Sequence, residues 1–396
     1  MRLKIAVTVL AFCVAALLSL GLVMLYSSSM TDSGSRFIKV QLIWSVIGLT
    51  CCVALACIDY KVLKPLALPG LVVSVVLLGL VFAPMVGVHR NGASRWLGYH
   101  KVSFFQPSEV AKLALIVALA WYCDRFQRQM PTFKKGIVIP GMLIGLVLGL
   151  IFIEPDRGTT ILLAGVSATM LLVAGVRWKF LIPQICLALV GLVISFMRDP
   201  MRLGRIRSWW HLEEHKTGVG RQAYEAMLAL GAGGWTGLGL GNSRQKLGFV
   251  SEKHTDFILS IIGEELGLIA TALVIVGFIC IVLCGIYIAM RAPDTFGLLL
   301  GSGISFLIGL QAFINIGVVT SALPNKGLPL PFISYGGSNL VLMLACVGLL
   351  LSIARQAREL EPVEQTAAKR KTHSDWGTAR NPFKTAPAGM ARQELS

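Results

Sequence analysis

Charged side chains are scarce in this chain of 396 residues, where Asp, Glu, Lys and Arg make up only 14% of the total. Soluble globular proteins carry about 25%. Apolar residues make up 55% of the chain, mean hydropathy is +0.73, and no polar stretch approaches the length of a soluble domain. Runs of roughly 20 mostly apolar residues recur instead, which is the length a helix needs to cross a bilayer. The sequence therefore predicts an all-α polytopic membrane protein.

Metal-binding cysteine patterns and a nucleotide-binding loop are also missing. All nine cysteines lie in apolar stretches, and none is spaced as CxxC or as a Cys/His ligand set. The P-loop pattern GxxxxGK[ST] does not occur. These absences disfavour a zinc site, a disulfide framework and nucleotide binding. We expect no organic cofactor and no nucleic-acid partner.

Ten apolar stretches predict ten transmembrane helices. The first is long for a cleaved signal peptide and no A-x-A-like site follows it, which favours an uncleaved helix. Residues 1–353 would form one transmembrane domain, with a large loop at 198–256 between helices seven and eight. The polar tail at 354–396 cannot bury a core, so we expect it to be disordered. The stretches lie at about 5–26, 40–58, 66–86, 108–123, 136–153, 159–176, 180–197, 257–290, 298–320 and 339–353.

Positive charge predicts the orientation, since the net charge is +16. The N-terminus, the turns after even-numbered helices and the tail are basic, which favours a multi-pass protein of the cytoplasmic (inner) membrane with both termini cytoplasmic. The loop at 198–256 carries nine Lys and Arg residues but is long, and long segments cross the membrane largely regardless of charge. Its excess charge fits either anionic lipid headgroups or an anionic substrate.

Two charged residues, Glu109 and Lys112, interrupt the fourth apolar stretch and share one helical face because they are three apart. An ionisable group inside a span is costly and marks a functional site by default. Two interpretations stay open. The pair locks two helices together, or Lys112 faces a substrate phosphate and Glu109 tunes it.

The turn Glu154-Pro-Asp156-Arg157-Gly158 separates the fifth and sixth predicted helices, and we expect its acids at the outer surface. A turn accounts for the proline and the glycine. It does not require two acids beside an arginine. A purely structural turn and a metal or substrate contact through Asp156 therefore both stay open.

The large loop ends in a glycine-rich segment, 231–241, followed by Arg244, Lys246 and Lys253 and then by Asp256. Closely spaced glycines allow the backbone to approach a ligand and offer N–H groups that suit phosphate or sugar. The three cations suit a negatively charged substrate. An acid at the boundary between loop and membrane suits a general base, and an Asp there suits an N-terminal helix cap equally well.

Polar side chains also lie inside the eighth and ninth predicted helices. Glu264 and Glu265 lie two turns into the eighth, so at least one should face the interior of the bundle. Gln311 and Asn315 are four apart in the ninth and share a face. We expect these four residues to line a polar interior, with Gln311 as a substrate-binding candidate. A plain helix–helix contact is the alternative for Gln311 and Asn315.

A Pro- and Gly-rich loop follows the ninth predicted helix and contains Lys326, Ser334 and Tyr335. Irregular backbone at membrane depth is tolerated only where protein buries it or where it lines a cavity. The sequence therefore predicts a cavity near the membrane surface, with Lys326 and Ser334 as substrate-binding candidates.

Four motifs together resemble the SEDS family (shape, elongation, division and sporulation), whose members include FtsW and RodA. The ten predicted helices agree with that resemblance. IGEELG and the lysine of LPNKG are more similar to the division branch of the family than to the elongation branch. In chain order, between residues 105 and 339, the motifs are FQPSEVAKL, EPDRGT, GLGNSRQKLGFVSEKHTDFILSIIGEELG and LPNKGLPLPFISYGGSN.

The resemblance implies a peptidoglycan glycosyltransferase that polymerises lipid II on the outer face of the cytoplasmic membrane, during cell division or elongation. Such an enzyme takes an undecaprenyl-diphosphate-linked donor, inverts the anomeric carbon and works with a class B penicillin-binding protein and other divisome proteins. The resemblance implies Asp256 as the catalytic acid of the site and places Glu109, Lys112 and Asp156 around a central cavity. A divalent cation, Mg or Mn, is a candidate cofactor with unspecified ligands.

Three departures from the family pattern occur: Val250-Ser251-Glu252 for LPE, Glu225 for Gln, and Arg157 for the Leu of EPDLG. A flippase for a lipid-linked precursor is the alternative function, since buried charges and broken helices also suit transporters. Transporters bind near the bilayer midplane, whereas the polar residues here concentrate in an outer loop, which favours the enzyme. A non-catalytic scaffold that recruits the transpeptidase is a third possibility.

Overall fold

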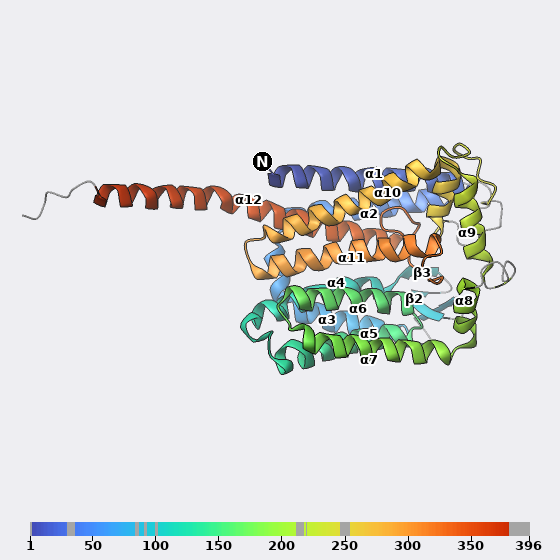
Figure 1. Cartoon of the computed structure of the whole chain (residues 1–396), viewed down its shortest axis with the longest axis horizontal. Coiled ribbons are helices and arrows are strands. Elements are labelled where there is room, and N and C mark those ends of the chain that lie inside the picture. The colour runs from blue at the N-terminus through green and yellow to red at the C-terminus, as the bar shows by residue number, and fades with distance from the viewer. Residues whose placement is uncertain are drawn as a thin grey trace, which may run out of the picture.

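The computed structural model describes residues 2–29, 36–83, 87–90, 93–99, 102–210, 218, 220–245 and 254–379. Within these residues, long helices run side by side along the longest axis of the molecule (Figure 1). They are α1 (Arg2–Ser29), α2 (Arg36–Cys57), α3 (Leu63–Leu80), α4 (Pro107–Arg125), α5 (Ile139–Ile153), α6 (Arg157–Val173), α7 (Trp178–Met197), α10 (Ile258–Met290), α11 (Thr295–Val319) and α12 (Gly337–Ala379).

Each predicted membrane helix corresponds to one of these long helices, and eight of them are long and apolar enough to cross a membrane. The other two are α4 and α6. Helix α6 has only 17 residues, and the 19 residues of α4 include the charged side chains of Glu109, Lys112, Asp124 and Arg125. The polytopic helical class is confirmed, and the number of ten crossings stays a prediction.

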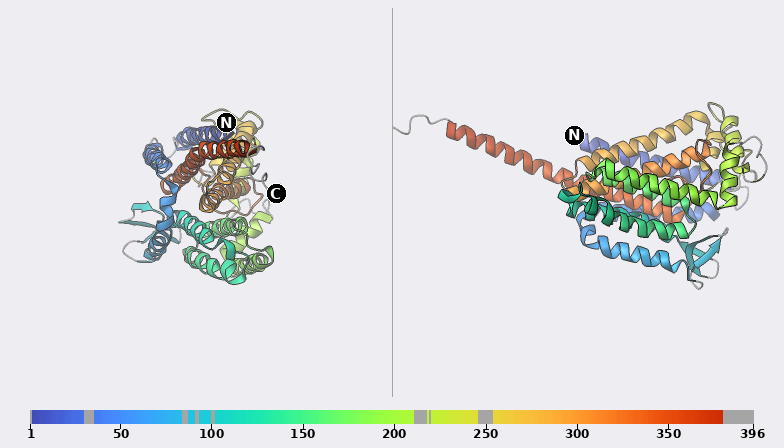
Figure 2. Two further views of the ribbon diagram at one scale, coloured as in Figure 1. Left: turned by 90° about the vertical axis from the view of Figure 1, so that its left-hand side faces the viewer. Right: turned by 60° about the horizontal axis from the view of Figure 1, so that its bottom comes forward.

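The two ends of the bundle differ in the segments that they carry. The N-terminus and the projecting part of α12 lie at one end (Figures 1 and 2). The opposite end carries α8 (Pro200–Trp210), α9 (Arg221–Ala232) and three short strands. Helix α12 continues to Ala379, well beyond residue 353, where the sequence places the end of the last span.

The strands are an addition to the all-helical prediction, which treats the segment between α3 and α4 as an irregular polar loop. Strands β1 (Gly87–Arg90), β2 (Ala93–Tyr99) and β3 (Val102–Phe105) form an antiparallel sheet in the order β1-β2-β3. The sheet lies outside the apolar helices, so it leaves the helical character of the membrane part unchanged.

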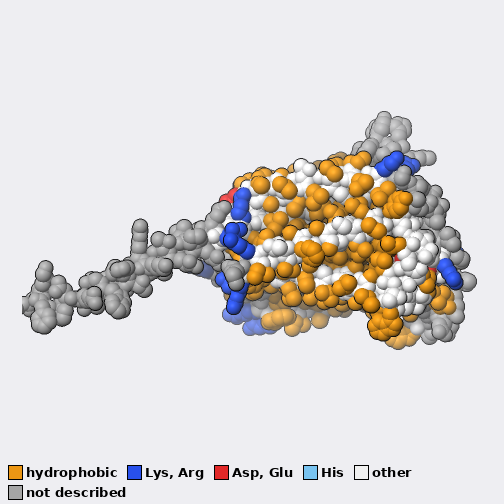
Figure 3. All heavy atoms as spheres, turned by 90° about the horizontal axis from the view of Figure 1, so that it is seen from above, with side chains coloured by type: hydrophobic (Ala, Val, Ile, Leu, Met, Phe, Trp, Pro, Cys, Tyr) orange, Lys and Arg blue, Asp and Glu red, His pale blue; other side chains and the backbone are white. Residues whose placement is uncertain are grey.

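The surface along the helices is apolar, as a lipid-facing surface must be. Hydrophobic side chains cover the long side of the bundle, and Lys and Arg gather near its ends (Figure 3). Helix α7 exposes most of its apolar side chains, whereas α11 and α12 bury most of theirs. Helix α11 packs against α4, α6 and α10, and α12 packs along α2. Gln311 and Asn315 of α11 and Asn339 of α12 are therefore buried inside the bundle.

Helix α10 is broken at Gly267, whose φ of +77° is rarely adopted by residues with a side chain. A Cβ on Gly267 would lie 2.4 Å from the backbone nitrogen of Gly237 and 2.5 Å from the carbonyl oxygen of Trp235. The glycine-rich segment thus lies directly against the break. The long eighth helix of the sequence prediction is therefore two helical pieces that meet at Gly267, and the glycine-rich segment packs against the point where they meet.

Candidate functional site

A buried hydrogen-bond network joins α4, α11 and α12. The Lys112 ammonium is fully buried and lies 2.8 Å from Oε1 of Glu109 and 3.3 Å from Oε1 of Gln311. The Gln311 amide in turn donates to Oδ1 of Asn339 at 3.0 Å and to the Pro329 carbonyl at 2.8 Å. The predicted shared face of Glu109 and Lys112 is confirmed, and the pair is an ion pair inside the bundle.

Asn315, one turn after Gln311, connects this network to Asp256. Its side-chain amide donates to the backbone carbonyls of Asp256 at 2.8 Å and Leu328 at 2.7 Å. The carboxylate of Asp256 lies against Gly327, because a Cβ there would be 2.5 Å from its Oδ2. The N-cap residue of α10 is Phe257. The helix-cap interpretation of Asp256 is therefore not the one that the structure adopts.

Ser334 fastens the Pro/Gly-rich loop to the segment before α10. Its hydroxyl donates to the Thr255 carbonyl at 2.6 Å and accepts from the Leu330 backbone N–H at 2.8 Å. The next residue, Tyr335, donates its backbone N–H to the His254 carbonyl at 2.9 Å. The proposed substrate-binding hydroxyl is thus engaged within the protein, one residue away from Asp256.

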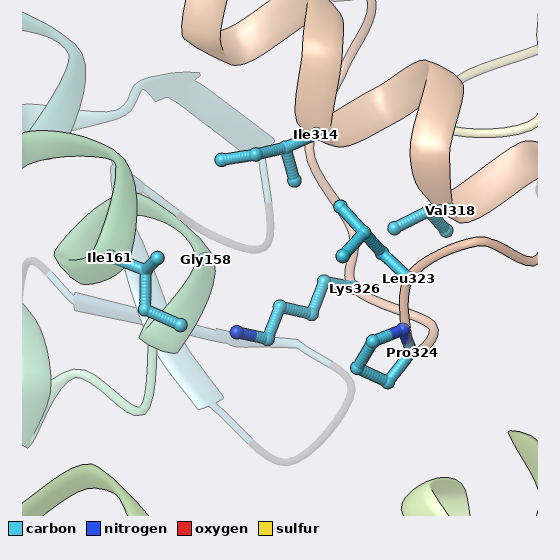
Figure 4. Close-up of a pocket in the computed structure, with 7 residues that line it drawn as sticks. All are labelled: Gly158, Ile161, Ile314, Val318, Leu323, Pro324 and Lys326. Atoms are coloured by element: carbon cyan, nitrogen blue, oxygen red, sulfur yellow. The ribbon is translucent and has the colours of Figure 1, made fainter. Parts of the chain in front are cut away.

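Lys326 borders a cavity between α6 and α11 with a volume of about 100 Å³ (Figure 4). The other lining residues are Gly158, Ile161, Ile314, Val318, Leu323 and Pro324. Figure 4 shows the Lys326 side chain extending from the loop toward α6. The predicted cavity exists, and its lining is apolar except for this lysine.

The ammonium of Lys326 has no ion-pair or hydrogen-bond partner within the described part of the chain, and it lies 5.3 Å from the centroid of the Phe196 ring. Burial and the nearby Arg157 guanidinium lower the pKa of Lys326 to about 8. The side chain still carries most of its charge at neutral pH. Gly327, the next residue in the chain, lies against the Asp256 carboxylate, whereas the Lys326 side chain points toward α6.

Both acids of the turn between α5 and α6 are buried within the protein. Asp156 caps α6 by accepting from the Thr159 backbone N–H at 3.1 Å and from the Thr159 hydroxyl at 2.9 Å. Glu154 is fully buried, and neither carboxyl oxygen has a hydrogen-bond partner in the described part of the chain. Burial and the neighbouring Asp156 raise the pKa of Glu154 to about 8 against the opposing effect of Arg95.

Arg95 of β2 is a residue that sequence reasoning missed. Its guanidinium donates to the carbonyl of Glu154 at 3.2 Å and to that of Pro155 at 2.7 Å. Arg157, the departure from the family pattern, lies over the Phe152 ring at 3.5 Å. The turn is held from outside by the sheet, a contact that no local pattern around residue 95 indicates.

Glu264 and Glu265 are buried but bind backbone instead of lining a cavity. Glu265 accepts from the Ser27 hydroxyl at 2.7 and 2.8 Å, from the Gly241 N–H at 3.0 Å and from the Ser243 N–H at 3.3 Å. Glu264 accepts from the Arg244 N–H at 2.9 Å. Buried carboxylates need such partners, since a buried unpaired charge is very costly.

The glycine-rich segment is likewise engaged within the protein. On the broken helix, the Glu264 carbonyl accepts from the Leu238 N–H at 3.0 Å, and the Glu265 carbonyl accepts from the Gly239 N–H at 3.0 Å. The expectation that these glycines offer N–H groups to phosphate is therefore wrong for this part of the segment. A side chain is excluded at Gly237, which lies so close to the backbone of Glu265 that a Cβ would be 2.2 Å from the Glu265 carbonyl oxygen.

The remaining predicted cations are only partly placed. Arg244 is exposed and near the carboxylate pair, and Lys246 and Lys253 lie outside the described residues. The described residues contain no group of three His, Cys, Asp or Glu side chains that could hold a metal ion. The structure thus brings Lys112, Gln311, Asn315, Asp256 and Lys326 into one connected region.

Comparisons with known proteins agree with this architecture. The chain is 40% identical over 87% of its length, and over 92% of the relative, to "Probable peptidoglycan glycosyltransferase FtsW" of Trichlorobacter lovleyi. It is 38% identical to "Stage V sporulation protein E" of Bacillus subtilis, over 86% of this chain and 95% of that one.

Two solved structures have the same fold. A chain from a peptidoglycan synthase complex aligns with a TM-score of 0.74 and 28% identity, over 88% of this chain and 97% of that one. The rod shape determining protein RodA of Thermus thermophilus aligns with a TM-score of 0.66 and 28% identity, over 88% of this chain and 96% of that one. The model of the FtsW, RodA and SpoVE family, described as "Cell cycle protein", matches residues 7–359. The chain therefore belongs to the FtsW/RodA/SpoVE family of cell cycle proteins.

Proposed function

We propose that the chain is a peptidoglycan glycosyltransferase that polymerises lipid II into glycan strands at the outer face of the cytoplasmic membrane. The carrying observation is that the Pro/Gly-rich loop lies against the Asp256 carboxylate at Gly327 and carries, one residue earlier, a cation without an ion-pair partner among the described residues. Membership of the family and the names of its relatives support the same reaction. Both termini would then be cytoplasmic, and the end that carries α8, α9 and the sheet would face outward.

The reaction needs one proton acceptor and one stabiliser of negative charge. Asp256 takes the proton from the 4-hydroxyl of the acceptor sugar, and the hydroxyl oxygen forms a bond to the anomeric carbon of the donor. The bond from that carbon to the diphosphate oxygen breaks with inversion, and the lipid diphosphate leaves with the electron pair. We assign Lys326 to the stabilisation of that charge in the transition state.

The deeper network supports these two residues. Asn315 holds the backbone of Asp256, and the Lys112–Glu109 pair fixes Gln311 and through it the Pro/Gly-rich loop. We assign Lys112, Glu109 and Gln311 to the support of the site rather than to direct contact with substrate. Arg244, Lys246 and Lys253 remain candidates for the outer part of the diphosphate site.

A divalent cation remains a candidate cofactor. Mg²⁺ is commonly held by one or two carboxylates together with substrate phosphates. The described residues contain no three-ligand cluster, so we assign no step of the reaction to a metal. Loss of polymer on chelation and its recovery with Mg or Mn would identify a cation that arrives with the diphosphate.

The test is polymerisation by purified protein, mixed with its class B penicillin-binding protein partner and lipid II. Asp256→Asn should lower the rate by about 10²–10⁴-fold, the usual contribution of general-base catalysis. Asp59→Asn is a matched control, since Asp59 is exposed and its side chain only accepts from the Lys61 N–H. Full activity of Asp256→Asn would refute the assignment. Transfer of labelled lipid across liposomes without polymer would favour the flippase instead.

A further inference from the structure

The first turns of α2 lie against the segment that carries Asp256, because Phe37 of α2 stacks on His254. Gln41 is 2% exposed, and its side-chain amide makes two bonds to the Pro/Gly-rich loop. Its Nε2 donates to the Ser334 carbonyl at 3.3 Å, and its Oε1 accepts from the Gly336 N–H at 3.3 Å. One amide thus bridges the backbone on both sides of Tyr335, as a neighbouring strand does.

An aromatic contact one turn earlier reinforces this bridge. The Phe37 ring stacks on the His254 ring at 4.7 Å between centroids with an interplanar angle of 24°. It also meets the Tyr335 ring edge-on at 5.0 Å. Phe37 thereby contacts both the loop and the segment directly before Asp256, and such ring pairs are stabilising beyond the area that they bury.

The loop passes this constraint on to Asp256 through bonds already described. Tyr335 donates its N–H to the His254 carbonyl, and Ser334 donates its hydroxyl to the Thr255 carbonyl. These two acceptors directly precede Asp256 in the chain. A shift of α2 or of the Gln41 amide therefore moves the backbone on which the Asp256 carboxylate is mounted.

Helix α2 is itself held rigidly against α12. A Cβ on Gly337 would lie 2.4 Å from the Trp44 ring, and a Cβ on Gly348 would lie 2.4 Å from the Cys52 carbonyl oxygen. The opposite face of α2, which includes Val46 and Val53, is exposed as a lipid-facing surface is. The helix is thus a firm support with one polar side chain, Gln41, reaching the site.

We propose that Gln41, assisted by Phe37, is a positioning residue that holds the Asp256 segment and the Pro/Gly-rich loop in their reactive arrangement. The inference rests on the proposed function, since it takes Asp256 as the base. Misplacement of a catalytic group by about 1 Å costs around 10²-fold in rate. Loss of the amide bridge should therefore lower kcat and leave KM nearly unchanged.

The kinetic test compares Gln41→Met, which keeps the length but removes both bonds, with Gln41→Glu, which keeps the acceptor for Gly336. We expect kcat to fall about 10- to 100-fold in Gln41→Met and by less in Gln41→Glu. Ser45→Ala is the matched control, because Ser45 is buried on the same helix and bonds only the Gln41 carbonyl of its own helix. Wild-type kcat in folded Gln41→Met would overturn the inference.

The structural test is hydrogen–deuterium exchange over residues 334–336 and 254–256 in the full-length protein. Both segments should exchange several-fold faster in Gln41→Met and Gln41→Glu than in Ser45→Ala, since each lost hydrogen bond contributes about 1 kcal/mol. Unchanged exchange would overturn the inference even if Asp256 is the base. Faster exchange combined with an active Asp256→Asn would instead reject the proposed function and keep the positioning role of Gln41.

Discussion

Charged residues gather at both ends of the bundle, but they are arranged differently. At the end from which α12 projects, Lys64 lies 3.1 Å from Asp124 and 2.9 Å from Asp294. Tyr60 also donates its hydroxyl to Asp294. At the other end, Lys326 has no such partner among the described residues. Lys64 is thus satisfied within the protein, whereas Lys326 is the cation that we propose binds the substrate diphosphate.

The titration behaviour follows the same difference. Burial by itself raises the pKa of Asp294, but the bonds from Tyr60 and Lys64 outweigh it and hold that pKa below its usual value. Lys326 has the opposite environment, since burial and the Arg157 charge both disfavour its ammonium. A bound diphosphate would relieve that cost. The pKa shifts thus distinguish Asp294, whose charge the fold stabilises, from Lys326, whose charge we assign to the substrate.

The largest effect is expected at the centre of the bundle, where Lys112 is paired and should behave as a stabilising charge. Lys112→Met leaves Glu109 buried without its partner, and breaking a buried pair in this way costs about 3–5 kcal/mol. Thermal unfolding in detergent should show a large loss of stability. The double variant Lys112→Met with Glu109→Gln should recover much of it. A stable but inactive Lys112→Met would place this lysine with the substrate-binding charges instead.

Substitution of one lysine at each end of the bundle should distinguish a substrate-binding cation from a cation that stabilises the fold. Lys326→Met should lower the rate of polymerisation about 100-fold with little change in the unfolding temperature, because it removes stabilisation of the leaving diphosphate. Lys64→Met should do the reverse, with a stability loss of about 1 kcal/mol and a normal rate per folded molecule. Thermal unfolding curves and polymerisation rates of the two variants test this prediction. Equal losses of stability in both variants would erase the contrast.

An effect that depends on pH is expected at Glu154, an acid without a hydrogen-bond partner among the described residues. Its pKa is raised from 4.5 to about 8, so the folded state binds its proton more tightly than the unfolded chain does. Stability is therefore greatest at acidic pH, falls as pH rises from about 4.5 to about 8, and levels off above that. Glu154→Gln should unfold at a higher temperature than the wild type near pH 8 and lose this advantage toward pH 5. Parallel unfolding profiles across this window would show that Glu154 ionises freely.

Much of the fold was predictable because membrane helices depend on local composition. The apolar stretches predicted each long helix to within a few residues, with exceptions at the C-terminal ends of α3, which ends six residues before its prediction, and of α12. The helix period placed Glu109 with Lys112 on one face, and the pair is in contact. The short sheet was missed, since its strands lack the clear alternation that would distinguish them from a polar loop.

The candidate site was only partly predictable, because polar residues can bind either a ligand or their own protein. Glu264, Glu265 and Ser334 looked equally suited to a cavity, yet their side chains bond nearby hydroxyl or backbone groups. Gln41 could not be recognised as a functional candidate from the sequence, since a single polar residue in an apolar helix can serve many roles. Which groups remain available to a substrate depends on long-range neighbours.

The sequence by itself determined the membrane class, the order of the helices and the family, because hydropathy and motif spacing are local properties. Only the tertiary structure decided the role of each polar residue. It buried Glu154, used Asp156 as a helix cap and placed Gly327 of the Pro/Gly-rich loop against Asp256. The physical reason is that burial and hydrogen-bond satisfaction are set by segments that meet in space, often hundreds of residues apart in the chain.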